Sequence, residues 1–211
     1  MKKDNYLNKI AESKKPFIIY KSNKGFDLFT DFSKKIILSN RNIENFINNS
    51  TKKKLKNKET DLYIGFFGYE ILNNLIDVKI KKQKGLKFPK GIFYKPETKK
   101  KLSNKLNYKP TDNSKSKGIF NINLNKVSYK NIFNKFKKKI KLGETYQIKI
   151  CTKYRKNSHI DALDFFCRLT KSNMAPEAFM INDKDYSIIS CSPENLITKT
   201  KNIISTKPIA G

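Results

Sequence analysis

Apolar and polar residues follow clear periods in the second half of the chain. From residue 128 to 143 apolar side chains recur every three or four positions, which predicts an amphipathic helix. Ser128 is the expected N-cap of this helix and Gly143 its left-handed end. Residues 146–154 alternate with period two, which predicts a half-buried strand, and residues 161–171 have the pattern of a second amphipathic helix.

Shorter apolar segments separated by turn residues predict several further elements. Two hairpins are expected, one from segments 177–181 and 186–191 and the other from segments 196–200 and 203–206. In the first half, the pattern predicts a strand over 16–20, a short helix over 43–48, a buried glycine-bearing segment over 63–69 and a helix over 70–78. Strands that cluster between helices favour an antiparallel α+β architecture over a βαβ array.

A polar, repetitive stretch over residues 95–118 predicts the only internal boundary, a basic and flexible linker. The predicted organisation is therefore an N-terminal region over 1–94, this linker, and a further domain that begins at 119 and continues to 211. The last strand is followed directly by Pro208-Ile-Ala-Gly211, which leads us to expect that this domain is incomplete.

The formal charge of +28 raises the question of a polyanionic partner. Only three of the 46 basic residues are arginine, namely Arg41, Arg155 and Arg168. Nucleic-acid readers favour arginine because its planar fork pairs with phosphates and guanine edges. The excess of lysine, asparagine and isoleucine, whose codons are A/T-rich, instead indicates a solvated lysine surface, so neither nucleic acid nor a membrane is an expected partner.

The cysteines and the N-terminus indicate a cytoplasmic protein. Cys151, Cys167 and Cys191 are widely spaced and form no CxxC pair, which argues against a zinc site and a disulfide framework. They are expected to be small core or cleft residues. No apolar run has the length of a signal peptide or a membrane span. The single histidine, His159, lies in a polar stretch and is expected at the surface.

Four segments occur in an order that resembles one enzyme family. They are Gly65-Phe-Phe-Gly-Tyr-Glu70, Gly143-Glu-Thr-Tyr-Gln147, Cys191-Ser-Pro-Glu194 and Lys207-Pro-Ile-Ala-Gly211. Together they resemble the chorismate-binding enzymes, which include component I of anthranilate synthase and of aminodeoxychorismate synthase. The resemblance implies antiparallel sheets packed together with helices outside, and a cleft that holds chorismate and Mg²⁺. It also implies that the magnesium carboxylates and a catalytic histidine follow residue 211, so residues 1–211 alone are expected to be inactive.

Within this resemblance Glu194 is the expected catalytic residue. The matching glutamate of the family lies beside the C4 hydroxyl of chorismate and acts as general acid. Hydroxide is a poor leaving group unless it is protonated as it departs, so the reaction requires such a group.

Two further positions distinguish the branches of the family. Isochorismate and salicylate synthases have a lysine at the position of Gln147, where it activates water; an amide does not titrate, so Gln147 favours ammonia as nucleophile. Aminodeoxychorismate synthases commonly have a lysine at the position of Ala210, and alanine offers no nucleophile, so ammonia is expected to attack C2 directly. Gly211 resembles the glycine whose backbone N–H approaches a substrate carboxylate.

These residues predict a synthase subunit that aminates chorismate with ammonia from a glutamine amidotransferase partner and gives anthranilate and pyruvate. The alternative is aminodeoxychorismate synthase component I, because Asn173-Met-Ala-Pro-Glu-Ala-Phe-Met180 is closer to that branch. Ser22, Asn173 and Pro176 mark the candidate regulatory pocket, but their surroundings depart from the tryptophan-binding pattern of anthranilate synthases. A more distant alternative is a non-catalytic basic module that binds nucleic acid with a steep salt dependence.

Overall fold

The computed structural model describes most of the chain in two compact units. The described residues are 6–22, 25–52, 62–69, 71, 88–110, 119–157 and 159–209. The first unit is formed by residues 1–110 and 162–211, and the second by residues 111–161. In the described part of the chain, no helix is long and apolar enough to cross a membrane.

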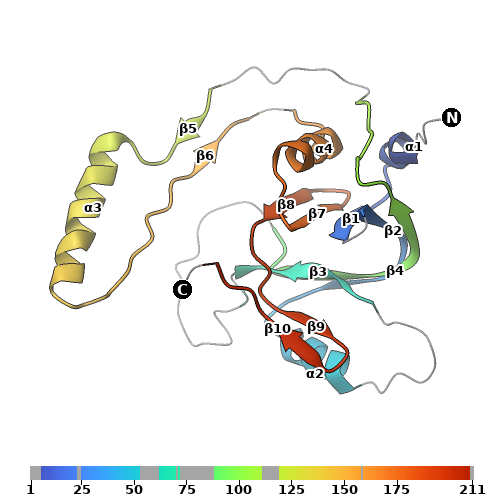
Figure 1. Cartoon of the computed structure of the whole chain (residues 1–211), viewed down its shortest axis with the longest axis horizontal. Helices are drawn as coiled ribbons and strands as arrows, with labels where there is room; N and C mark the ends of the chain where they lie inside the picture. The colour runs from blue at the N-terminus through green and yellow to red at the C-terminus, as the bar shows by residue number, and fades with distance from the viewer. Residues whose placement is uncertain are drawn as a thin grey trace. The chain divides into compact units, whose positions relative to one another are not determined.

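A six-stranded antiparallel sheet forms the centre of the first unit (Figure 1). Its strands are β1 (Phe17–Ser22), β2 (Gly25–Ile37), β3 (Ile64–Phe67), β4 (Gly91–Leu102), β7 (Glu177–Asn182) and β8 (Ser187–Ser192), in the spatial order β3-β4-β2-β1-β7-β8. All neighbouring strands run antiparallel, which confirms the predicted α+β class. Residues 177–182 and 187–192 form the first of the two predicted hairpins.

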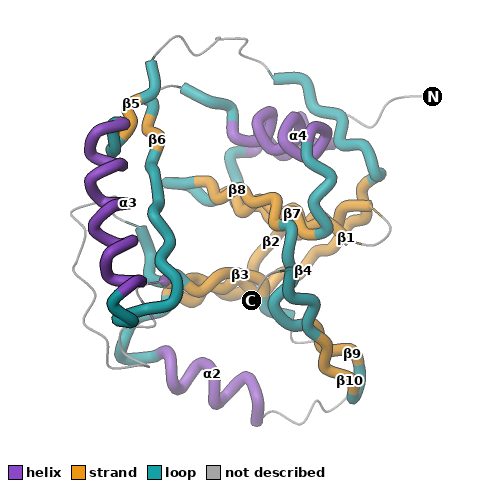
Figure 2. The backbone as a smooth tube through the Cα atoms, turned by 60° about the vertical axis from the view of Figure 1, so that its left-hand side comes forward, coloured by secondary structure: helices purple, strands orange, loops and turns teal. Residues whose placement is uncertain are grey.

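Two helices cover one face of this sheet, α1 (Tyr6–Ser13) and α4 (Ala162–Ser172), both labelled in Figure 1. Figure 2 shows α4 beside β7 and β8. The core between these helices and the sheet consists of Leu7, Ile10, Phe17, Ile19, Phe26, Leu28, Leu106, Leu163, Phe166, Cys167, Ala178 and Met180. The α4 members lie at helical spacing and the β1 members at alternate positions, so each element directs its apolar side chains to the same layer. The predicted helix over 161–171 is thus confirmed.

The opposite face of the sheet carries a second core, formed by Ile18, Phe29, Ile92, Tyr94 and Ile181. Because β1 lies near the middle of the sheet, Phe17, Ile18 and Ile19 are all almost completely buried. A third core packs α2 (Ile43–Lys52) against the sheet through Ile43, Leu38 and Ile71. The uninterrupted apolar run of β1 therefore reflects burial on both faces.

The second unit contains the long helix α3 (Lys126–Lys141) and a two-stranded ladder of β5 (Asn121–Ile122) and β6 (Tyr154–Arg155). The predicted helix is confirmed, but Asn125 and not Ser128 is its N-cap: the Asn125 side chain accepts a hydrogen bond from the Ser128 N–H at 2.8 Å. The cap therefore lies one turn earlier than predicted. Gly143 has a φ of 70°, which confirms the left-handed end of the helix.

A second hairpin follows the sheet, with β9 (Thr198–Thr200) paired antiparallel to β10 (Ile203–Ser205). This confirms the predicted second hairpin. Its apolar residues are exposed: Ile203 and Ile204 retain 71% and 69% of their accessible surface.

The predicted linker over 95–118 is corrected in its first part. Residues 95–102 were expected to belong to a linker but form the second half of β4, where they pair with β2 from Phe26 to Lys34. Their polar sequence reflects the exposure of Glu97, Thr98, Lys99 and Lys101 to solvent. Residues 103–110 form no helix or strand, but Leu106 is 3% exposed in the first core, so this part of the predicted linker packs against the sheet. The rest of the linker prediction, 111–118, lies outside the described residues, as does the predicted helix over 70–78 apart from Ile71. The division of the chain at 94 and 118 stays a prediction.

The close backbone approach predicted for 63–69 is confirmed at one glycine. A Cβ on Gly65 would lie 1.9 Å from the Ile92 carbonyl oxygen and 2.7 Å from the Phe93 Cα, so only glycine lets β3 pair with β4 in this register. The segment is less buried than predicted, since Phe67 and Tyr69 are 52% and 70% exposed.

Candidate functional site

Glu194 follows the end of β8 and lies in a tight turn. The Ser192 hydroxyl donates a hydrogen bond of 3.0 Å to the Glu194 carbonyl oxygen and accepts one of 3.5 Å from the Glu194 N–H. The Pro193 ring between them fixes one backbone dihedral angle of this turn. The carboxylate itself is exposed. The turn thus projects the Glu194 side chain from the end of the sheet.

The Glu194 carboxylate contacts the segment that precedes Ala210. The backbone N–H of Ile209 donates a hydrogen bond of 3.2 Å to Glu194 Oε1. Two of the four motif segments, 191–194 and 207–211, therefore adjoin in the first unit. Ala210 and Gly211 lie outside the described residues, so their predicted roles stay predictions.

A chain of polar side chains leads from Thr198, through Asn195 directly after Glu194, to the start of β7. The Asn195 amide donates 2.9 Å to Glu177 Oε1, and the Thr198 hydroxyl donates 3.0 Å to Asn195 Oδ1. The other Glu177 oxygen accepts a hydrogen bond from the Tyr20 hydroxyl of β1. Both oxygens of Glu177 are therefore engaged, and the hydrogen bonds tie the 194–198 segment to β7 and β1.

Tyr20 is held in its neutral, donating form. Burial, the hydrogen bond to Glu177 and the charge of that carboxylate together raise the pKa of Tyr20 to about 12. Ionisation would place two negative charges in contact, so the phenol keeps its proton over the whole neutral range.

The residues of this polar chain were not predicted from the sequence as site residues. One signal was present for Glu177: it starts a strand and lies on the same face as Phe179 and Ile181, where an apolar residue is expected. Asn195 gives no comparable signal apart from its position directly after Glu194.

Gln147 lies in the second unit, in a segment that is not part of a strand. The predicted strand over 146–154 is wrong except at its end, because only Tyr154 and Arg155 pair, with Ile122 and Asn121. A period-two pattern describes side-chain directions, whereas a strand also needs a backbone partner, and residues 146–152 belong to no ladder among the described residues. The Lys153 carbonyl oxygen accepts a hydrogen bond of 3.2 Å from the Asn123 N–H, directly before the ladder of β5 and β6. The Gln147 side chain is exposed. The backbone carbonyl oxygen of Gln147 accepts a hydrogen bond of 3.1 Å from the Thr145 hydroxyl.

The segments that carry Ser22, Asn173 and Pro176 come together in the first unit. The Lys21 ammonium donates a hydrogen bond to the carbonyl oxygen of Ala175, and β1 pairs with β7 directly beyond it. Asn173 and Pro176 are exposed, and the side chain of Ser22 lies outside the described residues. The regulatory pocket formed by these residues stays a prediction.

The histidine and two of the cysteines have the environments that the sequence indicated. His159 is exposed. Cys167 is 3% exposed in the core under α4, and burial raises the pKa of the half-buried Cys191, so its thiolate is disfavoured. Cys151 is exposed, which corrects the expectation of a core or cleft position.

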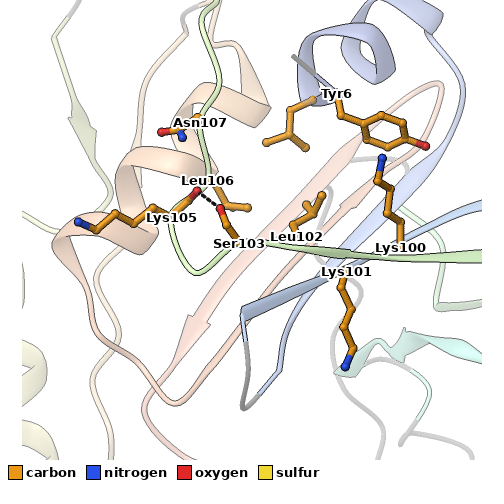
Figure 3. A pocket seen from close by; sticks show the side chains of 9 residues that line it. Tyr6, Lys100, Lys101, Leu102, Ser103, Lys105, Leu106 and Asn107 are labelled. Atoms are coloured by element: carbon orange, nitrogen blue, oxygen red, sulfur yellow. Dashed lines mark hydrogen bonds between the residues drawn. The ribbon is translucent and has the colours of Figure 1, made fainter. Parts of the chain in front are cut away.

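A shallow hollow of about 190 Å³ lies elsewhere in the first unit, between α1, the end of β4 and residues 103–107. Figure 3 shows Lys100 directed toward the Tyr6 ring, where its Nζ lies 3.5 Å from the ring centroid, while Lys101 and Lys105 point away. The lysines thus do not converge on one point, and none of the predicted site residues lines this hollow.

Comparison with known proteins decides the family. The family model of the chorismate binding enzymes matches residues 5–211. The chain belongs to this family. The match covers almost the whole sequence and includes all four motif segments, which confirms the resemblance drawn from their order.

Relatives of this chain come from two branches of the family. It is 33% identical over 118 residues to anthranilate synthase component 1 of Buchnera aphidicola subsp. Rhopalosiphum padi, a match that covers 54% of this chain and 22% of that protein. The corresponding protein of Buchnera aphidicola subsp. Schizaphis graminum is 30% identical over 144 residues, which are 67% of this chain and 26% of the relative. Aminodeoxychorismate synthase component 1 of Salmonella typhimurium is 28% identical over 89 residues, 42% of this chain and 20% of the relative.

Among the described residues of this chain, no group of three or more His, Cys, Asp or Glu side chains is placed to hold a metal ion. Glu177 and Glu194 each accept hydrogen bonds from protein donors. The requirement for Mg²⁺ stays a prediction.

Proposed function

We propose that this chain forms part of a synthase that aminates chorismate with ammonia and gives anthranilate and pyruvate as products. Membership of the chorismate-binding family and the relatives named anthranilate synthase component 1 support this proposal. The observation that carries it is the contact between Glu194 and the Pro208-Ile209 backbone, which joins the acid motif to the motif that precedes Gly211.

In the proposed reaction ammonia adds at C2 of chorismate and the C4 hydroxyl leaves as water. Loss of the enolpyruvyl group as pyruvate and of the C2 proton then gives anthranilate. Glu194 would donate the proton that converts the departing hydroxyl to water. Gln147 would leave ammonia as the nucleophile because its amide cannot deprotonate water, and Ala210 offers no side-chain nucleophile that could attack C2 first.

The partner in this proposal is a glutamine amidotransferase subunit that supplies ammonia. The names of the relatives support it only in so far as they describe a component 1, which implies a second component. A supply of free ammonium would replace this partner in an assay.

Aminodeoxychorismate synthase is the second candidate. The segment Met174 to Phe179 and the Salmonella relative favour it. In that reaction ammonia finally enters at C4, and the product serves p-aminobenzoate synthesis.

Complementation separates the two candidates. The complete gene that encodes this chain is expected to restore growth without tryptophan to a strain that lacks anthranilate synthase component I, when the amidotransferase subunit is supplied. It is expected not to restore growth without p-aminobenzoate to a strain that lacks aminodeoxychorismate synthase component I. The reverse pattern would assign the chain to the second candidate.

A further inference from the structure

Asp183 is a buried carboxylate in the turn between β7 and β8. It is 8% exposed. Lys35 of β2 donates to Asp183 Oδ2 at 2.6 Å, and the Tyr94 hydroxyl of β4 donates to the same oxygen. The Lys184 N–H donates to Oδ1 at 2.7 Å, and the Tyr186 hydroxyl lies 3.3 Å from that of Tyr94. Lys35, Tyr94, Asp183 and Tyr186 are called the Asp183 cluster below.

This cluster joins parts of the sheet that its backbone ladder keeps apart. In the order β3-β4-β2-β1-β7-β8, two strands separate β4 from β7 and three separate it from β8. Neighbouring strands lie about 4.8 Å apart, so a flat sheet would hold Tyr94 and the β7–β8 turn roughly 14 Å apart. Their direct hydrogen bond therefore requires the sheet to curve until its far parts meet.

Aromatic contacts extend this link to the edge strand β3. The rings of Phe88 and Tyr186 lie 5.0 Å apart, and those of Phe66 and Phe88 lie 5.4 Å apart. Phe66 belongs to β3 and Tyr186 to the turn before β8, which are the two edge strands of the sheet. Side chains thus connect the two edges across the concave face.

We propose that the Asp183 cluster holds the curved sheet closed at the end of the β7–β8 hairpin opposite to Glu194, and that acid releases this closure. The hairpin turn lies at one end of β7 and β8, and Ser192 and Glu194 at the other. The cluster therefore fixes the curvature of the strands that carry the candidate site without contacting that site.

The acid sensitivity follows from the balance of interactions at Asp183. Burial acts to raise its pKa, but the hydrogen bonds from Lys35, Tyr94 and the Lys184 N–H outweigh burial and lower the pKa below its usual value. A carboxyl whose folded pKa is lowered stabilises the fold at pH values above its unfolded pKa, about 3.9. This stabilisation is lost as pH falls through the folded pKa.

The two phenols of the cluster, Tyr94 and Tyr186, do not titrate below neutral pH. The pKa of Tyr94 is raised by burial first and then by its hydrogen bonds to Asp183 and Tyr186. The pKa of Tyr186 is also raised, mainly by burial. Both phenols therefore remain protonated in acid. Among the described contacts, the Asp183 carboxyl is the group whose charge changes below neutral pH.

The test compares Asp183→Asn with Asp185→Asn in the chain of residues 1–211. Asp185 is an exposed carboxylate of the same turn, so its replacement changes the net charge equally without touching the cluster. Asp183→Asn is expected to lower the folding equilibrium constant at pH 7 by about 10- to 100-fold in urea titrations. Asp185→Asn is expected to leave it within about 2-fold. Equal values for the two variants would overturn the proposal.

Hydrogen exchange of backbone amides shows whether the curvature of the whole sheet depends on Asp183, or only the β7–β8 turn. Faster exchange is expected in Asp183→Asn both in the turn and in residues 64–67 and 91–95 on the far side of the sheet. Faster exchange confined to residues 182–187 would overturn the proposal. If Asp183→Asn does not fold, Tyr94→Phe removes one donor while it keeps the ring, and the same far-side exchange is expected.

The pH dependence gives a second readout. As pH falls from 7 through the folded pKa of Asp183, the folding equilibrium constant of the wild type is expected to decrease by a larger factor than that of Asp183→Asn, because only the wild type has a carboxylate at this position to protonate. Parallel decreases in both proteins would contradict acid release.

Discussion

Replacement of Glu194 by glutamine is expected to lower kcat for chorismate by about 10²- to 10⁴-fold in the complete gene product, the range that a positioned general acid contributes. Glutamine has nearly the same shape, and its oxygen can still accept the 3.2 Å hydrogen bond from the Ile209 N–H. It cannot deliver a proton to the departing C4 hydroxyl. The measurement is the initial rate with chorismate, Mg²⁺ and ammonium at saturating concentrations.

Glu44→Gln is the matched control for this variant. Glu44 lies exposed in the first turn of α2, so its replacement is expected to leave kcat within about 2-fold. Glu194→Gln with the same kcat as the control would remove Glu194 from the chemistry, and family membership would stand without it.

Replacement of Phe166 by alanine is expected to lower the free energy of unfolding by about 3–5 kcal/mol, the usual cost of a large buried aromatic. The ring is 0% exposed in the middle of the core between α4 and the sheet. It also packs edge-to-face on Phe26, with centroids 6.0 Å apart, and this contact would be lost. Urea unfolding followed by far-UV circular dichroism measures the change, since the chain contains no tryptophan.

The adjacent Phe165 provides the control in the same helix. It is 40% exposed, so Phe165→Ala removes the same atoms from a surface position and is expected to cost about 1 kcal/mol or less. Similar losses for the two variants would show that α4 does not pack on the sheet as described.

The elements that the sequence predicted correctly are those with strong local signals. The α3 and α4 patterns have helical spacing over three or more turns, and the two hairpins combine short strand segments with polar turns such as Lys201-Asn202. In each case the residues that decide the structure lie close together in the chain. The shift of the α3 cap from Ser128 to Asn125 shows the usual uncertainty at a helix end.

The wrong predictions concern segments whose structure depends on distant partners. Residues 95–102 include five consecutive polar residues, 97–101. They nevertheless form a strand, because β2 offers backbone partners along their length. Residues 146–152 have the better strand pattern, yet they belong to no ladder in the described part of the chain. Periodicity reports which face of a segment is apolar, whereas pairing is a property of the whole fold.

The candidate site was predictable only through its motifs. Glu194 followed from the resemblance to the family, but its contact with Ile209 and the hydrogen bonds from Tyr20 and Asn195 to Glu177 join residues up to 157 positions apart. No local pattern reveals such contacts. The Asp183 cluster has the same character, since Lys35 and Asp183 are 148 positions apart.

The product formed from chorismate tests the central proposal most directly. The complete gene product, incubated with chorismate, Mg²⁺ and ammonium in the absence of any amidotransferase, is expected to release anthranilate and pyruvate in equal amounts. Aminodeoxychorismate as the product, with no release of pyruvate, would contradict amination at C2 and with it the roles given to Gln147 and Ala210.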